Sequence, residues 1–199
     1  MPVRPWRDTR VIFTLAVLAA VAVILLLIES QPPTPTRARA LTYEPVSASA
    51  IVAFYQAHGS QLANQRTADA ILLAARRHNV NPGVLVAITG QEQSFVPIGD
   101  DPRIAKNPFN VYGCWCKTTI PIEESAEVAA GTVAHRLLCV PAKPGSNLVV
   151  WINSFANPCV KKEGVYAEDR HWGIGVALIF RDTVAPALGL DTHAAIFRG

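Results

Sequence analysis

One glutamate of the sequence, Glu92, shares a helical face with apolar residues. In the stretch from Val84 to Phe95, the residues Leu85, Ile88, Glu92 and Phe95 follow one another at intervals of 3, 4 and 3 positions. This spacing places their side chains on one face of a helix, and we expect that face to pack inward. Burial disfavours the charged form of a carboxyl group, so the pKa of Glu92 should rise. A carboxylic acid that stays protonated near neutral pH can donate a proton to a leaving oxygen.

Gly90 precedes this acid on the same helix. Because glycine has no side chain, we expect another part of the backbone or a substrate to approach the helix there. The alternative is that Glu92 is an ordinary glutamate that faces water at the end of its helix. A negative charge near a helix C-terminus is mildly unfavourable, so a glutamate that only faces water would not stabilise the helix at this position.

The elements that must position this acid are predicted to be helices, because apolar residues recur at helical spacing and no alternating βαβ pattern is present. Asn81-Pro82 is a helix start signal, with Asn as the cap and Pro at the first helical position. A loop is expected over about 96–113 and a short β-hairpin or irregular lobe over Val111 to Thr119. The fold class is therefore mainly α, and the expected helices are Ser49 to His58, Thr67 to His78, Pro82 to about Phe95, Pro121 to about Leu138, Leu148 to Phe155 and His171 to Val184.

The N-terminal part of the chain is predicted to anchor it in a membrane. Val11 to Ile28 holds no charge and no proline, and at about 1.5 Å per residue a helix of this length matches a hydrocarbon core. Three arginines, Arg4, Arg7 and Arg10, precede it and should keep residues 1–10 in the cytoplasm. The alternative is a cleaved signal peptide, but the small residues around Arg39 lie far from the apolar run. We expect a transmembrane segment over 11–28, a Pro-rich spacer over 29–45 and an extracytoplasmic domain over 46–199.

The composition limits the classes of molecule that the chain is expected to bind. A formal net charge of +3 over 199 residues is too small to suggest nucleic acid and is compatible with an anionic wall or membrane surface. The four cysteines of the exported part favour two disulfides. Residues two positions apart seldom meet disulfide geometry, so two pairings remain open: Cys114–Cys139 with Cys116–Cys159, or Cys114–Cys159 with Cys116–Cys139. A zinc site is the alternative, but the spacing lacks the usual C-x2-C, and no metal is expected.

Several short stretches resemble the lysozyme-like superfamily. Ala-Ile-Thr-Gly-Gln-Glu92-Gln-Ser-Phe95 is similar to its catalytic helix. Asn107-Pro-Phe-Asn-Val-Tyr-Gly113 resembles the Asn-Asn-Leu-Phe-Gly stretch of its glucosaminidase branch. Val165-Tyr-Ala-Glu-Asp-Arg-His-Trp172 resembles a late Tyr-Ala-Thr-Asp motif of that branch, and the likeness spans about Thr67 to Val184.

The resemblance implies a lysozyme-like fold and a glycosidase that cuts β-1,4 bonds between N-acetylglucosamine and N-acetylmuramic acid in peptidoglycan. Glu92 would be the general acid, and no cofactor would be needed. Tyr166 would lie in the cleft near the acid, although a core or capping tyrosine is the alternative. Further substrate contacts would come from residues around the two motifs, namely Gln91, Ser94, Phe95, Asn107, Phe109 and Asn110. For the asparagines, the alternative is a role in turns.

A second carboxylate, which many glycosidases use, is harder to assign. Asp101 follows Glu92 by nine positions, a spacing that some lysozymes share, but Asp-Asp-Pro is also an ordinary turn. The chain lacks the Gly-Leu-Met-Gln motif of soluble lytic transglycosylases and the Gly-Trp-Gly that usually follows the glutamate in glucosaminidases. Hydrolysis and formation of an anhydro product therefore both remain open. A peptidoglycan-binding scaffold without catalysis, within a cell-envelope complex, is the alternative function.

Overall fold

The structure, a computed structural model, describes residues 41–139, 147–164 and 166–192, without the side chains of residues 138, 139 and 163. The expected transmembrane segment over 11–28 and most of the spacer lie outside these residues. Within the described part, no helix combines the length and the apolar character that crossing a membrane requires. Leu41 is already buried in the core, and its carbonyl accepts a hydrogen bond from the Asn81 N–H. The folded domain thus begins before residue 46, where the sequence placed its start.

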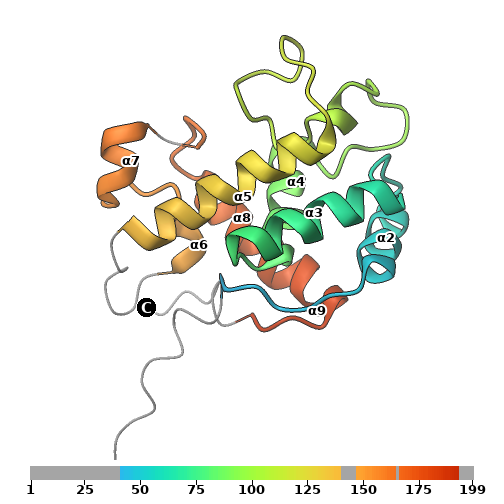
Figure 1. Ribbon diagram of the computed structural model, residues 1–199, viewed down its shortest axis with the longest axis horizontal. Coiled ribbons are helices and arrows are strands. Elements are labelled where there is room, and N and C mark those ends of the chain that lie inside the picture. The colour runs from blue at the N-terminus through green and yellow to red at the C-terminus, as the bar shows by residue number, and fades with distance from the viewer. Residues whose placement is uncertain (1–40, 140–146, 165, 193–199) are drawn as a thin grey trace, which may run out of the picture. The chain divides into compact units, whose positions relative to one another are not determined.

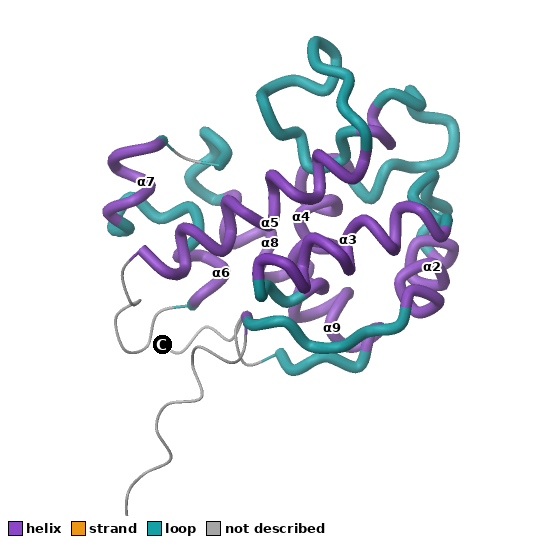
Figure 2. Tube along the Cα trace, in the orientation of Figure 1, coloured by secondary structure: helices purple, strands orange, loops and turns teal. Residues whose placement is uncertain are grey.

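The described part of the chain is helical and contains no strand, which confirms the mainly α class (Figure 2). Its one β-type contact is an isolated bridge between Ser60 and Pro97. The segment over 111–119 is an irregular lobe of turns rather than a hairpin. In chain order the helices are α2 (Ala48–Ala57), α3 (Gln65–His78), α4 (Pro82–Gln93), η2 (Ile104–Lys106), α5 (Ile122–Cys139), α6 (Leu148–Trp151), α7 (Pro158–Glu163), α8 (Trp172–Ile179), η3 (Phe180–Val184) and α9 (Ala185–Leu188).

Helix α4 forms the centre of the domain and packs against α3, α5, α8 and η3 (Figure 1). Every residue from Pro82 to Thr89 is buried. The Asn81 side chain accepts the Gly83 N–H at 2.9 Å, and Pro82 occupies the first turn, as the start signal predicted. Because α4 is covered on all sides up to its last turn, its C-terminal end is fixed firmly relative to the surrounding helices.

Helices α3 and α5 lie side by side in front of α4 in Figure 1. Their inner faces bury small residues, and two ion pairs join their outer faces. Arg66 lies 2.6 Å from Glu123, and Arg77 lies 3.1 Å from Glu127. This pairing makes α5 a rigid wall on the same side of the domain as the end of α4.

Several helical features differ from expectation. Helix α6 ends at Trp151 and not at the expected Phe155. Helix α7 was not predicted, although Asn157-Pro158 repeats the start signal of α4: the Asn157 side chain accepts the Cys159 N–H at 3.0 Å. The helix expected over 171–184 instead runs as α8, a π-helical segment η3 and then α9. Pro186 in the first turn of α9 has no N–H to donate to the preceding turn, which explains the interruption of the regular helix.

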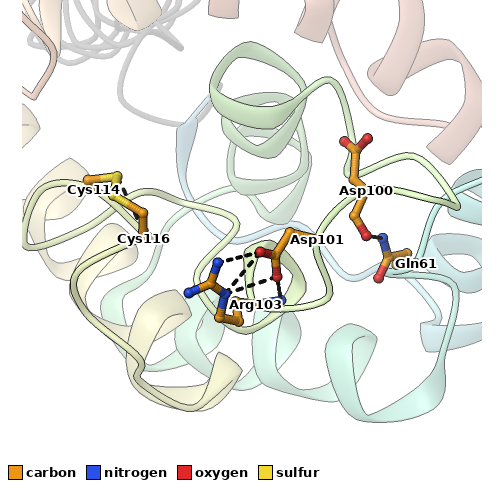
Figure 3. Close-up of polar contacts among 6 residues, drawn as sticks. All are labelled: Gln61, Asp100, Asp101, Arg103, Cys114 and Cys116. Carbon is orange, nitrogen blue, oxygen red and sulfur yellow. Dashed lines mark hydrogen bonds and ion pairs between the residues drawn. A yellow bond between two sulfur atoms is a disulfide. The ribbon is translucent and has the colours of Figure 1, made fainter.

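The expected pairing of the cysteines is wrong. Cys114 is bonded to Cys116, the pairing that sequence separation seemed to exclude, and this rules out both expected pairings (Figure 3). A turn makes the bond possible, since the N–H groups of Lys117 and Thr118 both donate to the Cys114 carbonyl. The two Cα atoms thereby come within 5.1 Å, inside the range that disulfides occupy. Cys159 is also disulfide-bonded, while the side chain of Cys139 lies outside the described part.

Candidate active site

The carboxylate of Glu92 is held at both oxygens. The Trp172 indole Nε1–H donates to Oε1 at 2.6 Å, and the Asn110 Nδ2–H donates to Oε2 at 3.2 Å. Glu92 occupies the last turn of α4, Trp172 opens α8 and is almost fully buried, and Asn110 lies in the loop between η2 and α5. Three separate elements therefore converge on one acid, which they fix in a single orientation.

The surroundings of Glu92 favour its neutral form. Desolvation by burial raises the pKa of its carboxyl group above the usual value, and the hydrogen bonds from Trp172 and Asn110 offset only part of this effect. The side chain is half-buried, so one part of it faces protein and the other remains accessible. Both the raised pKa and the partial exposure favour proton donation by this carboxyl group.

Glu92 opens onto a cavity of about 770 Å³. Three chain segments form its walls: the irregular lobe over 110–115, one face of α5, and the segment that precedes α8. The face of α5 contributes Val128, Thr132 and Arg136, and the last segment contributes Gly164 and residues 166–168. A space of this size accommodates a ligand much larger than water, in the range typical of small-molecule sites.

Tyr166 lines the same cavity and is half-buried. Its ring stacks on Trp172 with centroids 4.6 Å apart, and its hydroxyl donates to the Phe109 carbonyl at 2.9 Å. Burial and the nearby charge of Glu92 raise the pKa of the phenol, so it stays protonated. The structure thus places Tyr166 beside the acid, where it supports the indole that binds Glu92.

The three residues expected from the 107–110 motif separate into two kinds. Asn107 and Phe109 are fully buried and do not line the cavity. Asn107 instead ties the loop together, since its Oδ1 accepts from the Val111 N–H at 3.2 Å and from the Ser125 hydroxyl at 2.7 Å. The structure does not place them at this cavity, and the contacts of Asn107 fit the alternative of a turn-forming asparagine. Asn110 does face the cavity, and its Oδ1 also accepts the Trp115 N–H at 3.2 Å.

A left-handed turn follows Glu92, and its residues do not line the cavity. Ser94, Phe95 and Val96 all adopt positive φ, at 49°, 63° and 53°. L residues with a β-carbon rarely adopt this left-handed conformation, and it costs on the order of 1 kcal/mol or more at each position. Hydrogen bonds hold the turn, from the Ser60 hydroxyl to the Phe95 carbonyl and from the Gln61 N–H to the Val96 carbonyl at 2.9 Å.

This left-handed turn brings the Phe95 ring back over Gly90. A β-carbon added to Gly90 would lie 2.5 Å from Phe95 Cζ, so the space beside the glycine is filled by this ring and not by substrate. Gln91 packs in the same way against Gly175 of α8. Gln91, Ser94 and Phe95 are therefore not among the residues that line the cavity.

Asp101 does not line the acid's cavity. It forms a close ion pair with Arg103, 2.5 Å between Oδ2 and Nη2, in the loop after α4 (Figure 3). The hydrogen bonds from Arg103 lower the pKa of this carboxyl group. The neighbouring Asp100 is exposed, and its backbone carbonyl accepts from the Gln61 side chain at 2.8 Å. Asp101 is not among the residues that line the cavity, so its predicted role finds no support in this geometry.

Sequence reasoning missed several side chains that the structure brings to this site, among them two tryptophans and a glutamate. Trp172 binds the acid directly, and Trp115 and Glu168 line the cavity. Trp172 begins an apolar helix, so the sequence indicates that its ring is buried. A buried indole N–H needs a hydrogen-bond acceptor, and this need could have pointed to a polar partner in the core. For Trp115 and Glu168, both in irregular segments, the sequence holds no such signal.

No protein-family model, curated protein or solved structure matches this chain. Among the described residues, no group of three or more His, Cys, Asp or Glu side chains gathers where it could hold a metal ion.

Proposed function

We propose that this chain is a lysozyme-like glycosidase that cleaves the glycan strands of peptidoglycan, with Glu92 as the proton donor. One observation supports this proposal above all: a half-buried carboxyl group of raised pKa, held at both oxygens, opens onto a cavity large enough for sugar units. The motifs around Glu92, Asn110 and Tyr166 that resemble the lysozyme-like superfamily all meet at this cavity, which adds weight to the resemblance.

In the proposed reaction, the protonated Glu92 donates its proton to the oxygen of the β-1,4 bond, and the bond between that oxygen and the sugar C1 breaks. The N–H groups of Trp172 and Asn110 then hold the carboxylate that remains. Because both donors favour the charged form, they stabilise the acid after it has given up its proton. Tyr166 acts as a positioning residue that keeps the Trp172 ring in place.

The substrate fits the character of the cavity walls. Its lining mixes aromatic surface from Tyr112 and Trp115 with polar groups from Asn110 and Thr132. Aromatic faces pack against the apolar face of a sugar ring, while amide and hydroxyl groups pair with its hydroxyl and acetamido groups. The sequence also predicts a membrane anchor, which would place the domain beside the cell wall.

The test compares purified full-length wild type with Glu92→Gln on isolated peptidoglycan sacculi. Soluble fragments are separated and identified by mass spectrometry. We expect the variant to release fragments about 10²- to 10⁴-fold more slowly, because an amide cannot donate this proton. Glu124→Gln, an exposed glutamate in the first turn of α5 and outside the cavity, is the matched control and should keep the wild-type rate.

Equal release by wild type and Glu92→Gln would refute the proposal. Sacculus binding by the wild type without any release would favour the alternative of a scaffold that holds peptidoglycan without cutting it.

A further inference from the structure

Glu168 is the second carboxylate at the cavity of Glu92. Among the described residues that line this cavity, Glu92 and Glu168 are the acidic ones. Glu168 precedes α8 on the segment that also carries Tyr166, and its side chain is exposed to solvent. Two carboxyl groups in one cavity of this kind are the usual arrangement for breaking a glycosidic bond.

A buried asparagine fixes the backbone that presents Glu168. Asn153, only 7% exposed, accepts the Tyr166 N–H at 2.6 Å and donates its Nδ2–H to the Ala167 carbonyl at 3.0 Å. The Ala167 N–H makes a third, longer contact to the same Oδ1 at 3.4 Å. The residue immediately before Glu168 is therefore held at both its N–H and its carbonyl, so the carboxylate starts from a defined position.

The two carboxyl groups have opposite environments. Glu92 is half-buried and its neutral form is favoured by desolvation, whereas Glu168 lies at the solvent-exposed side of the cavity. Environments that differ in this way divide the roles of acid and base between two carboxyl groups. Asp101 fits the second role less well, because Arg103 engages its carboxylate and because it does not line the cavity.

We propose that Glu168 is the base that activates the attacking water, which makes the reaction a hydrolysis. This inference rests on the proposed glycosidase function. Glu92 gives its proton to the glycosidic oxygen as the C1–O bond breaks, and Glu168 takes a proton from water as the water oxygen bonds to C1. The sum is one water added per bond cut, and the new chain end is a reducing sugar rather than an anhydro sugar.

The experiment uses the full-length protein on sacculi in water enriched in ¹⁸O. Wild type should yield reducing ends that carry one ¹⁸O atom. Glu168→Gln should slow release about 10²- to 10⁴-fold, while Glu124→Gln, equally exposed but outside the cavity, should match wild type. Because Glu168 is exposed, its replacement should leave folding intact, and sacculus binding by the variant checks this directly.

A second variant tests whether Glu168 acts on the side of C1 where the attack occurs. In Glu168→Ala, added sodium azide should restore cleavage and yield glycosyl azide, because this small anion attacks C1 without needing a base. The same salt should not restore Glu92→Gln, which lacks the proton donor. Anhydro ends without ¹⁸O from the wild type, full activity of Glu168→Gln, or a Glu168→Ala variant that azide fails to restore would each overturn the inference.

Failure of this inference can be told apart from failure of the proposed function. If Glu92→Gln is inactive while Glu168→Gln cleaves at the wild-type rate, only the role of Glu168 is lost. If the wild type releases no fragments at all, the glycosidase proposal itself fails.

Discussion

Trp172 lowers the pKa of Glu92 through a single indole N–H, against the larger effect of burial. Replacing Trp172 by Phe removes a hydrogen bond that stabilises the ionised carboxylate, so the pKa of Glu92 should rise further above its usual value. The working form of the acid is protonated, and activity falls as pH rises through its pKa. We therefore expect the alkaline limb of the kcat/KM profile to move to higher pH in Trp172→Phe, measured as fragment release across a pH series.

Trp151→Phe separates this effect from loss of packing. Trp151 is also a buried tryptophan, it lies on α6 outside the cavity, and its Nε1 has no hydrogen-bond partner among the described residues. Both variants lose packing worth roughly 1–2 kcal/mol of unfolding free energy. Only Trp172→Phe should shift the pH profile, and an unchanged alkaline limb in that variant would contradict the assigned role of the indole.

At the level of residues, the sequence was informative about Glu92 and much less about its partners. Leu85 and Ile88 are buried, as their spacing predicted, but so is every other residue from Pro82 to Thr89, so α4 has no single buried face. The spacing nevertheless pointed to an acid whose side chain is half-buried. Trp172 reaches Glu92 across 80 positions of the chain and Asn110 across 18. Such pairings depend on how helices pack, and periodicity within one helix carries no information about them.

The end of helix α4 depends on an interlock between Gly90 and the Phe95 ring. Ala at position 90 would place a β-carbon 2.5 Å from the ring, and Phe54 and His58 pack against the ring and restrict its movement. Overpacking of this kind costs about 1–3 kcal/mol, more than the gain of up to about 1 kcal/mol in helix propensity. Gly90→Ala should therefore lower the free energy of unfolding, measured by chemical denaturation, and reduce activity because Glu92 shares this turn.

Phe95→Leu tests whether the clash is the cause. If it is, the double variant with Gly90→Ala should be more stable than the sum of the two single losses predicts, by about 1 kcal/mol or more. Strict additivity would mean that Gly90 matters for another reason.

At the level of elements, most helices could be predicted because their start signals are local. The Asn-Pro pair that begins α4 also begins α7, which shows that this signal can be applied more widely than the hydrophobic pattern alone suggests. The left-handed turn over 94–96 could not be predicted. Its residues are not the glycines that favour positive φ, and contacts from the distant residues Ser60 and Gln61 help to hold it.

At the scale of the whole molecule, the cavity lies between regularly packed helices and an irregular lobe. The packed pair of α3 and α5 and the buried helix α4 supply the acid and one wall of the cavity. The lobe over 110–115 supplies another wall of the cavity and has no regular secondary structure. The Cys114–Cys116 bond and the hydrogen bond from the Trp115 N–H to Asn110 hold it together. The position of this lobe could be predicted from the sequence, but the disulfide within it could not. A tight turn brings Cys114 and Cys116 to bonding distance although only one residue separates them in the chain.

The predicted anchor decides which compartment this cavity faces. Residues 1–45 fused to a reporter phosphatase that needs disulfides should give activity in intact cells and sediment with membranes, because Val11 to Ile28 is long enough to span. Changing Arg4, Arg7 and Arg10 to Glu should reduce the activity several-fold, since the positive charges that hold the N-terminus inside are gone. A matched fusion with the three arginines changed to Lys keeps the charge and should behave as the parent. A soluble, shortened and active fusion would instead identify the segment as a cleaved signal peptide.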